Sequence, residues 1–462
     1  MTRPSYSHSH AEPRPVSMRF LHFSTTDGPG GAGRAAYRLH TALRGAGHAS
    51  QMLVRHRGSG NGLGFTDYCN VQAVPTSKLV AQLRRLQKHL PWIHPPRARF
   101  TFNNDLETGV RWRGAVDAVE QPVDAVCLHW VADFLTSRSI RAIYHRFDVP
   151  LLWTAMDQEP VTGGCHYAFG CEGYEHECGN CPLLERPSAV DRSRQVFLRK
   201  QRYLGDLPIT FIAPTSWVEE RIRQSALFGR HRVERIPLAI DTSVFRVDDR
   251  AVARRALGIP LKKQVIFFGS SYLHEPRKGG DHLIEAIRRF QMDLSRAQQG
   301  QTIAADDVLL LMAGRNGEEL KRRLPFAVCD LGYLNDEGKL AKAYQAADVF
   351  ICPSIEDAGP MMIPESMLCG TPVVAFHAGG APDLVVSGLT GYLARVNDAA
   401  DLAQGIVQVL ASPQRVGLGE AAAQAARQLH EPHDVAQRYA ALVEELARGH
   451  HLAGDERRPA AA

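Results

Sequence analysis

The sequence lacks any long apolar run, and this excludes an integral membrane protein of the helical kind. No stretch approaches the ~18–20 consecutive apolar residues that a membrane-spanning helix needs. Residues 1–17 are polar and contain prolines without an apolar core, which does not fit a secretory signal. We therefore expect a disordered tail over 1–17 and a cytoplasmic protein, at most peripheral at the inner face of the membrane. Repeats of solenoid period are also absent.

A large excess of one charge is absent as well. The 462 residues carry 54 Lys and Arg against 49 Asp and Glu, a formal net charge of +5, and charged residues make up 22%. Nucleic-acid-binding proteins usually concentrate basic side chains on one face, so we expect no nucleic-acid partner. A mild excess suits an anionic small substrate or an anionic membrane surface. The length is too great for one hydrophobic core and suits two domains.

Short apolar runs that end in small or polar residues predict two successive α/β units. The first series of expected strands is Met18–Ser24, Ala125–Leu128, Pro150–Thr154 and Thr210–Ala213; the second is Val265–Phe268, Val308–Met312, Val349–Cys352 and Pro372–Phe376. Helical spacing separates them, as over Asp281–Phe290 and Glu337–Ala347. The pattern predicts two facing Rossmann-like domains with ligands at the carboxyl ends of the strands.

The expected domain limits follow from these series. We place an N-terminal domain at 18–238, with a cysteine-rich insertion at 163–182, and a C-terminal domain at 239–430. An amphipathic helix over 431–449 should pack back on one of the domains, and 450–462 reads as a disordered tail.

The strongest chemical signal follows the expected strand Val349–Cys352. A loop there holds Glu356 and Asp357, and a helix that begins nearby carries Glu365, with seven residues between Asp357 and Glu365. Backbone N–H groups at the start of that helix would favour a diphosphate, and the carboxylates would accept from sugar and ribose hydroxyls. The amides in question belong to Gly359, Met361 and Met362. The alternative interpretation is a capped helix with solvated acids.

A second loop follows the strand Val265–Phe268. Gly269 and Ser270 would let the backbone approach phosphates, and Arg277 and Lys278 lie within reach of them. The alternative is a solvated basic turn. The base of a nucleotide is expected near the later segment Gly332, Tyr333 and Leu334.

The N-terminal glycine loop contains Gly30 and Gly31 and opens a helix, which places it on the ligand side of the first domain. A dehydrogenase would show a similar loop, but the spacing is not G-x-G-x-x-G, and no acid ends a clear second strand. The sequence therefore disfavours an oxidoreductase.

Four of the nine cysteines lie within the insertion, spaced C-x5-C-x6-C-x2-C. Cys165, Cys171, Cys178 and Cys181 suit a tetrahedral structural zinc. Free thiols or a redox-sensitive loop are the alternatives.

These motifs together resemble the family-4 retaining glycosyltransferases of GT-B fold, over about Phe20–Asp401. The resemblance rests on Asp357-x7-Glu365 in the place of the family's E-x7-E, on the following C-G-T-P-V-V and on R-K-G. It implies that Asp357 stands at the first glutamate and that Glu365 binds the ribose. It also implies that Lys278 neutralises the diphosphate. The stretch with T-G-G-C-H and C-G-N-C-P resembles the bacterial exopolysaccharide, colanic-acid-type subgroup.

The sequence departs from that family at several positions. Asp357 is one methylene shorter than glutamate, Ser270 stands where relatives often have arginine, and Met156 replaces a histidine that lies over the donor sugar in several relatives. Asp157 is retained. His129, at the end of an expected strand, is a candidate substitute for the lost histidine; alternatively it is a core or loop histidine.

The resemblance implies transfer of a hexose, with retention, from a GDP- or UDP-linked sugar to a glycan or lipid-linked acceptor in bacterial polysaccharide biosynthesis. No D-x-D motif is present to hold a catalytic metal, so none is expected. A GT-B epimerase and a degenerate sugar-nucleotide-binding scaffold are the alternatives. The basic stretch Ser77–Phe102 would contact an anionic membrane, or else form a helix with a solvated face.

Overall fold

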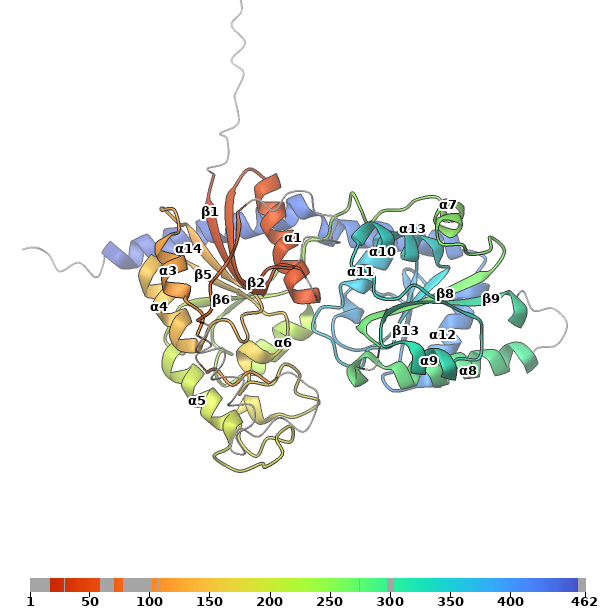
Figure 1. The fold of residues 1–462 in the computed structure, drawn as a ribbon, viewed down its shortest axis with the longest axis horizontal. Coiled ribbons are helices and arrows are strands. Elements are labelled where there is room, and N and C mark those ends of the chain that lie inside the picture. Colours follow the sequence, from red (N-terminus) through yellow and green to blue (C-terminus); the bar gives the residue numbers. More distant parts are fainter. Residues whose placement is uncertain are drawn as a thin grey trace, which may run out of the picture.

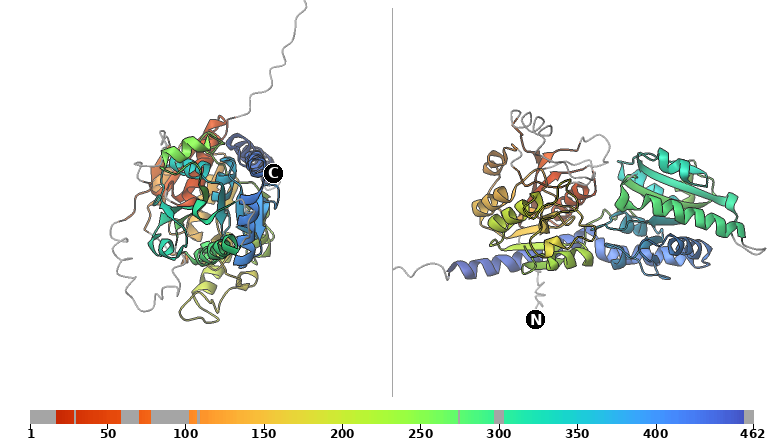
Figure 2. Two further views of the ribbon diagram at one scale, coloured as in Figure 1. Left: turned by 90° about the vertical axis from the view of Figure 1, so that its right-hand side faces the viewer. Right: turned by 90° about the horizontal axis from the view of Figure 1, so that it is seen from below.

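The computed structural model describes residues 17–28, 30–58, 70–77, 102–106, 109–273, 275–296 and 303–455. Two α/β bodies lie side by side, and the last helix runs along the N-terminal one (Figures 1 and 2). Within the described ranges, no helix is both long and apolar enough to cross a bilayer. The prediction of two Rossmann-like parallel-sheet domains is confirmed.

The N-terminal domain contains a parallel sheet of seven strands in the order β3-β2-β1-β4-β5-β6-β7. The strands are β1 (Arg19–Thr26), β2 (Ala49–His56), β3 (Val71–Ala73), β4 (Ala125–Leu128), β5 (Leu151–Thr154), β6 (Ile209–Ala213) and β7 (Arg232–Arg235). The helices are α1 (Gly31–Gly45), α3 (Trp112–Asp117), α4 (Ser137–Phe147), α5 (Arg192–Leu204) and α6 (Ser216–Gln224). Strands β4, β5 and β6 are buried at every residue, as parallel strands covered on both faces should be.

The C-terminal domain contains a parallel sheet of six strands in the order β10-β9-β8-β11-β12-β13. The strands are β8 (Gln264–Tyr272), β9 (Val308–Arg315), β10 (Val328–Asp330), β11 (Val349–Cys352), β12 (Val373–Phe376) and β13 (Gly391–Ala394). The helices are α7 (Arg250–Ala256), α8 (Gly280–Arg296), α9 (Glu318–Arg323), α10 (Glu337–Ala346), α11 (Met362–Leu368), α12 (Ala399–Ala411) and α13 (Arg415–His430).

The last helix, α14 (Pro432–Asp455), follows the C-terminal domain and returns to the N-terminal one. Its buried side chains, among them Val435 and Val443, pack with Leu39 and Leu43 of α1. The Tyr439 hydroxyl lies 2.9 Å from the Thr154 hydroxyl at the end of β5. The helix continues past residue 449, where we expected a disordered tail to begin.

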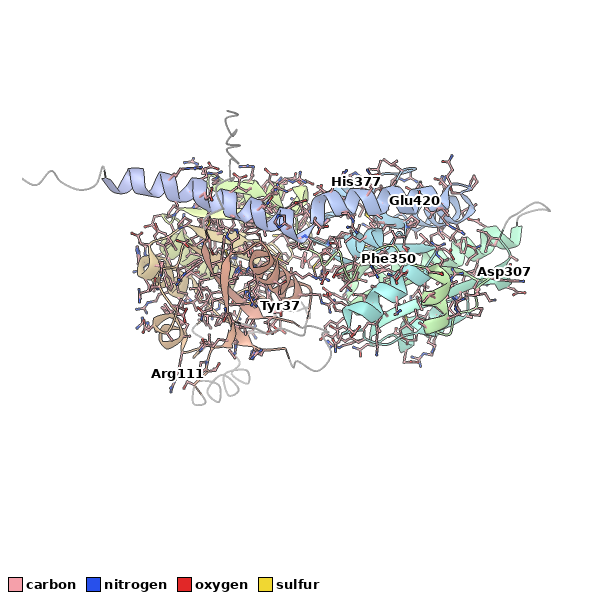
Figure 3. All side chains as sticks on the ribbon, turned by 90° about the horizontal axis from the view of Figure 1, so that it is seen from above. Tyr37, Arg111, Asp307, Phe350, His377 and Glu420 are labelled. Atoms are coloured by element: carbon pink, nitrogen blue, oxygen red, sulfur yellow. The ribbon has the colours of Figure 1, made fainter. Side chains whose placement is uncertain are left out.

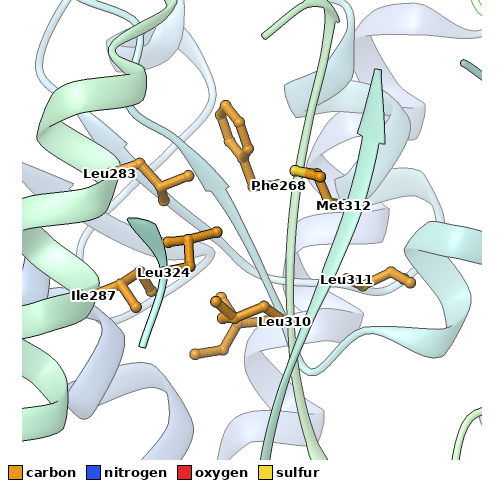
Figure 4. Close-up of a pocket in the computed structure, with 8 residues that line it drawn as sticks. Phe268, Leu283, Ile287, Leu310, Leu311, Met312 and Leu324 are labelled. Carbon is orange, nitrogen blue, oxygen red and sulfur yellow. The ribbon is translucent and has the colours of Figure 1, made fainter. Parts of the chain in front are cut away.

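Each domain has its own core. Tyr37 on α1 and Phe350 on β11, labelled in Figure 3, are each 1% exposed. A small gap between β8, β9 and α8 is lined only by apolar side chains, including Phe268, Leu283 and Met312 (Figure 4). Because it offers no polar side chain to a ligand, this gap belongs to core packing.

Candidate active site

The two domains meet where the glycine loop of the first faces the start of α11 in the second. Gly31 lies so close that a Cβ on it would be 3.7 Å from Cε of Met361. Gly30, directly before α1, has φ of 89°, a conformation that favours glycine. Gly31 therefore lies at the junction of the domains, and Gly30 directly precedes it; their place on the ligand side stays a prediction.

Asp357 is the centre of a buried charge cluster at the carboxyl end of β11. Nζ of Lys278 forms an ion pair with its Oδ2, and Nη1 of Arg277 lies 3.4 Å from the same oxygen. The carboxylate is 6% exposed, and burial alone would raise its pKa. The charges of Lys278 and Arg277, with a hydrogen bond from the Gly359 backbone, outweigh burial and lower the pKa below its ordinary value. The cluster thus holds an ionised carboxylate between two cations.

Two glycines make this cluster sterically possible. Gly279, directly after Lys278, has φ of 71°, and a Cβ there would lie 1.9 Å from the carbonyl oxygen of Pro353. Gly379 has φ of 54°, and a Cβ there would lie 2.0 Å from the carbonyl oxygen of Asp357. Any side chain at either position would push apart the loops that bring Lys278 and Asp357 together.

The expected phosphate-binding amides are only partly available. The Gly359 amide is taken up by Asp357, which differs from the expectation that it would face a diphosphate. The amides of Met361 and Met362 precede the hydrogen-bonded body of α11 and have no backbone acceptor in the described part of the chain.

Gly269 and Ser270 lie at the end of β8, beside this helix. A Cβ on Gly269 would be 2.9 Å from Cε of Met362, so the strand and helix approach closely there. The Ser270 side chain is 5% exposed and donates to the carbonyl of Tyr272 at 3.1 Å. It is therefore engaged within its own turn and is no substitute for a cationic side chain.

The segment expected to hold the base follows β10. Gly332 has φ of 63°, and its carbonyl accepts from Gly314 at 2.9 Å. The guanidinium of Arg315 lies 3.7 Å from the ring centroid of Tyr333, a cation–π contact. Leu334, which follows, is half-buried against the domain core.

Glu365 contacts the other domain, which the sequence did not indicate. Glu365 is 1% exposed, and its Oε1 accepts from Nη2 of Arg38 at 2.8 Å. Its Oε2 accepts from the Tyr344 hydroxyl at 3.3 Å. A ribose hydroxyl at this carboxylate would have to share it with Arg38 or displace that guanidinium.

Arg38 itself comes from α1 and is 3% exposed. It also donates to Oε1 of Glu337 at 2.8 Å, and its guanidinium lies 5.2 Å from the ring centroid of Phe245. Burial alone would lower its pKa, but Glu365 and Glu337 outweigh burial and raise it. The only sequence signal was an arginine off the apolar face of the first helix, which normally means a solvated side chain.

The cysteine-rich insertion reaches the loop of the C-terminal domain that holds Glu356 and Asp357. The Tyr167 ring lies 4.2 Å from the Arg277 guanidinium, and the Tyr167 hydroxyl is hydrogen-bonded by the Ala358 backbone. The Phe169 amide donates to Oε2 of Glu356 at 3.2 Å. Burial raises the pKa of Glu356 despite this hydrogen bond. Sequence reasoning missed Tyr167 and Phe169, whose only signal was aromatic character next to the first two cysteines.

His129 lies in the core of the N-terminal domain, which agrees with the alternative interpretation and not with a ligand-contacting role. It is 2% exposed, and its Nε2 lies 2.9 Å from Nδ1 of His22 on β1. Burial, together with nearby His40, lowers its pKa to about 3, so it is a neutral core histidine. A different histidine, His166, lies 2.5 Å from Oδ2 of Asp157 through its Nδ1.

The four clustered cysteines line one small cavity inside the insertion, together with residues such as Gly163 and Ser193. All four are free thiols. In the ranges that the structure describes, no three His, Cys, Asp or Glu side chains are arranged to hold a metal ion. Zinc binding at Cys165, Cys171, Cys178 and Cys181 would therefore require these side chains to turn toward a common centre.

We expect purified protein to contain about one zinc per chain if the thiols close around a metal, because four thiolates form a complete tetrahedral shell. Metal analysis of the wild type beside a Cys178→Ser, Cys181→Ser variant tests this. Retention of zinc in the variant would mean that the metal is not held by these four thiols. Absence of zinc from both proteins would mean that the thiols are free.

Residues 78–101, most of the expected basic amphipathic stretch, lie outside the described residues. The expectation that Ser77–Phe102 contacts a membrane or carries a solvated face therefore stays a prediction.

Residues 262–412 match the family model described as glycosyl transferases group 1. The chain is similar to D-inositol 3-phosphate glycosyltransferases: 31% identical over 189 residues to that of Mycobacterium leprae strain Br4923, covering 40% of this chain and 42% of the relative. The protein of Mycobacterium avium is 29% identical over 185 residues, covering 39% and 42%. The alignments thus span less than half of these relatives.

Solved structures show the fold over most of the chain. Sucrose-phosphate synthase from Thermosynechococcus elongatus superposes with a TM-score of 0.65 at 18% identity, covering 93% of this chain and 99% of that one. Anabaena HepE in complex with UDP-glucose gives 0.61 at 18% identity, covering 93% and 100%.

The fold of the chain places the protein in the GT-B class. More particularly, residues 262–412, which match the group 1 glycosyltransferase model, contain the Lys278–Asp357 cluster.

Proposed function

We propose that the protein is a retaining, metal-independent glycosyltransferase that uses a UDP- or GDP-linked hexose. The observation that carries this proposal is the cluster of Lys278 and Arg277 around the buried Asp357, at the strand edge of a domain that matches the group 1 model. The UDP-glucose bound to HepE, which shares the fold, supports a nucleotide-sugar donor.

Lys278 and Arg277 bind the diphosphate in this proposal, with the amides of Met361 and Met362 beside them. They stabilise the charge that develops as the bond between the anomeric carbon and the phosphate oxygen breaks. Cations already held in place by a buried carboxylate need little reorganisation when that charge appears. Glu356 and Asp357 hold the sugar, and Glu365 lies on the ribose side.

The acceptor hydroxyl attacks the anomeric carbon on the face that the diphosphate leaves. The new carbon–oxygen bond forms as the old one breaks, and the hydroxyl proton passes to the departing phosphate oxygen. This sequence of events retains the anomeric configuration and needs no dedicated protein base.

The proposed acceptor is a glycan or lipid-linked oligosaccharide of bacterial exopolysaccharide synthesis. It rests on the T-G-G-C-H and C-G-N-C-P stretches and on the basic composition of Ser77–Phe102. Attraction of that stretch to an anionic membrane surface would place the protein beside a lipid-linked acceptor. The epimerase alternative finds no support among the similar proteins.

Thermal shift against UDP-glucose, UDP-galactose, UDP-GlcNAc, GDP-mannose and GDP-fucose, all in EDTA, tests donor binding. We expect one donor to raise the melting temperature without added metal, because Lys278 and Arg277 replace the metal's charge. A hundredfold excess over Kd stabilises by about 2.7 kcal/mol, enough for a clear shift.

Addition of Mg²⁺ or Mn²⁺ serves as the control. Binding that appears only with metal would contradict the metal-independent mechanism, and binding of none of the five donors would contradict the proposed class of substrate. Binding without turnover would favour the degenerate scaffold.

A further inference from the structure

The buried pair of Asp157 and His166 lies at the carboxyl edge of the N-terminal sheet. Asp157 follows β5 closely, and Trp130 follows β4. Oδ2 of Asp157 lies 2.5 Å from Nδ1 of His166 and 3.0 Å from Nε1 of Trp130. With a proton on Nδ1 directed at Asp157, Trp130 also donates to the carboxylate, and both donors fix the imidazole plane. The side chain of His166 is 5% exposed.

The second ring nitrogen of His166 has no hydrogen-bond partner among the described residues. Nδ1 of the side chain donates to Asp157 and lies 3.1 Å from Nε1 of Trp130, which donates to the same carboxylate. The imidazole is held at Nδ1, and Nε2 is not among the fully enclosed unpaired nitrogens of the described residues. Such a nitrogen is suited to receive a polar group of a ligand.

The contacts of the residues that follow His166 indicate which ligand this nitrogen would receive. Tyr167 packs on Arg277 and is bonded by the Ala358 backbone, and the Phe169 amide binds Glu356. These contacts attach the segment after His166 to the loop that, in the proposed function, holds the transferred sugar. The thioether of the neighbouring Met156 has no hydrogen-bond donor.

We propose that His166 is a sugar-contacting residue, whose Nε2 forms a hydrogen bond with a hydroxyl of the donor hexose while Asp157 and Trp130 hold the ring. This inference rests on the proposed function. Its chemistry is that of a positioning contact: a hydroxyl fixed by a rigid imidazole orients the anomeric carbon toward the acceptor. No bond to His166 forms or breaks.

Two substitutions separate the nitrogens. An asparagine side-chain nitrogen matches Nδ1 of histidine, whereas that of glutamine matches Nε2. We expect His166→Asn to keep the contact with Asp157 and to lower kcat/KM for hydrolysis of the sugar nucleotide by about tenfold or more, the worth of one buried hydrogen bond. His166→Gln should recover much of this loss. The affinity for the nucleoside diphosphate alone should stay unchanged in both.

His176→Ala is the matched control, because His176 lies in the same insertion and is exposed. The donor is whichever of the five sugar nucleotides the wild type hydrolyses fastest, and UDP or GDP is the corresponding diphosphate. A wild type that hydrolyses none contradicts the proposed function and not the role of His166.

Three results would overturn the role of His166 itself. One is an Asn variant with wild-type kcat/KM. Another is a variant that loses diphosphate affinity in parallel, which would indicate a structural role. The third is normal hydrolysis with loss of transfer only, which would place His166 on the acceptor. A donor that lacks the contacted hydroxyl should be hydrolysed equally by the wild type and the Asn variant.

Discussion

Replacement of Lys278 by alanine is expected to reduce the release of nucleoside diphosphate from the donor by about 100- to 1,000-fold in kcat, the usual cost of one preorganised charge-stabilising group. Lys278 forms an ion pair with Asp357 beside Arg277, so its charge is already held where the proposed mechanism places the leaving group. The measurement is steady-state release of UDP or GDP under saturating donor.

Lys262→Ala is the control, since Lys262 is an exposed lysine of the same domain. The melting temperature of each variant shows whether it is folded. A folded Lys278→Ala protein with wild-type kcat would contradict the role of this cation, and a loss confined to KM would mean that Lys278 binds the donor without favouring its departure.

Replacement of Arg38 by alanine is expected to lower the free energy of unfolding by about 3–5 kcal/mol, because it removes one partner of a buried ion pair and leaves charge uncompensated. Arg38 joins Glu337 and Glu365 across the domain boundary, and all three side chains are at most 4% exposed. Urea denaturation measures the loss. Arg138→Ala, which changes an exposed arginine on α4, should stay within about 0.5 kcal/mol of wild type.

The effect of pH on this variant has a definite sign. Burial already raises the pKa of Glu337 above its ordinary value, although Arg38 and Arg34 oppose that rise. Without Arg38 the pKa rises further. A carboxyl whose pKa is higher in the folded protein binds protons more readily there, so acidification favours folding. The deficit should therefore shrink as pH falls from about 8 to about 5. A deficit that is small, or that grows on acidification, would contradict this account of the interface.

The strands that the sequence predicted are those that the sheets bury on both faces. Strands β4, β11 and β12 are continuous apolar runs because helices cover each side of a parallel sheet. The missed strand β2 contains Ser50 and Gln51 among its apolar residues, and the missed strand β7 lies at the sheet edge, where only Val233 is buried. Neither has the uniform run on which the prediction depended.

The candidate site was predictable where its polar residues are close together in the sequence. The nearby pair Glu356 and Asp357 and the turn with Lys278 stand out in the sequence, and the structure brings Lys278 and Asp357 together. The contact of Arg38 with Glu365 spans 327 positions and no periodicity reveals it. His129 is a core histidine for a similar reason, because its partner His22 lies on a neighbouring strand that is distant in the sequence.

The most direct test of the central claim is release of nucleoside diphosphate from the five sugar nucleotides by the wild-type protein in EDTA. The account predicts that one donor is hydrolysed slowly without metal and faster with a suitable acceptor, and that its sugar is released or transferred with the α or β configuration that it had in the donor. Absence of release from every donor, with or without acceptor and metal, would contradict a glycosyltransferase built on Lys278 and Asp357.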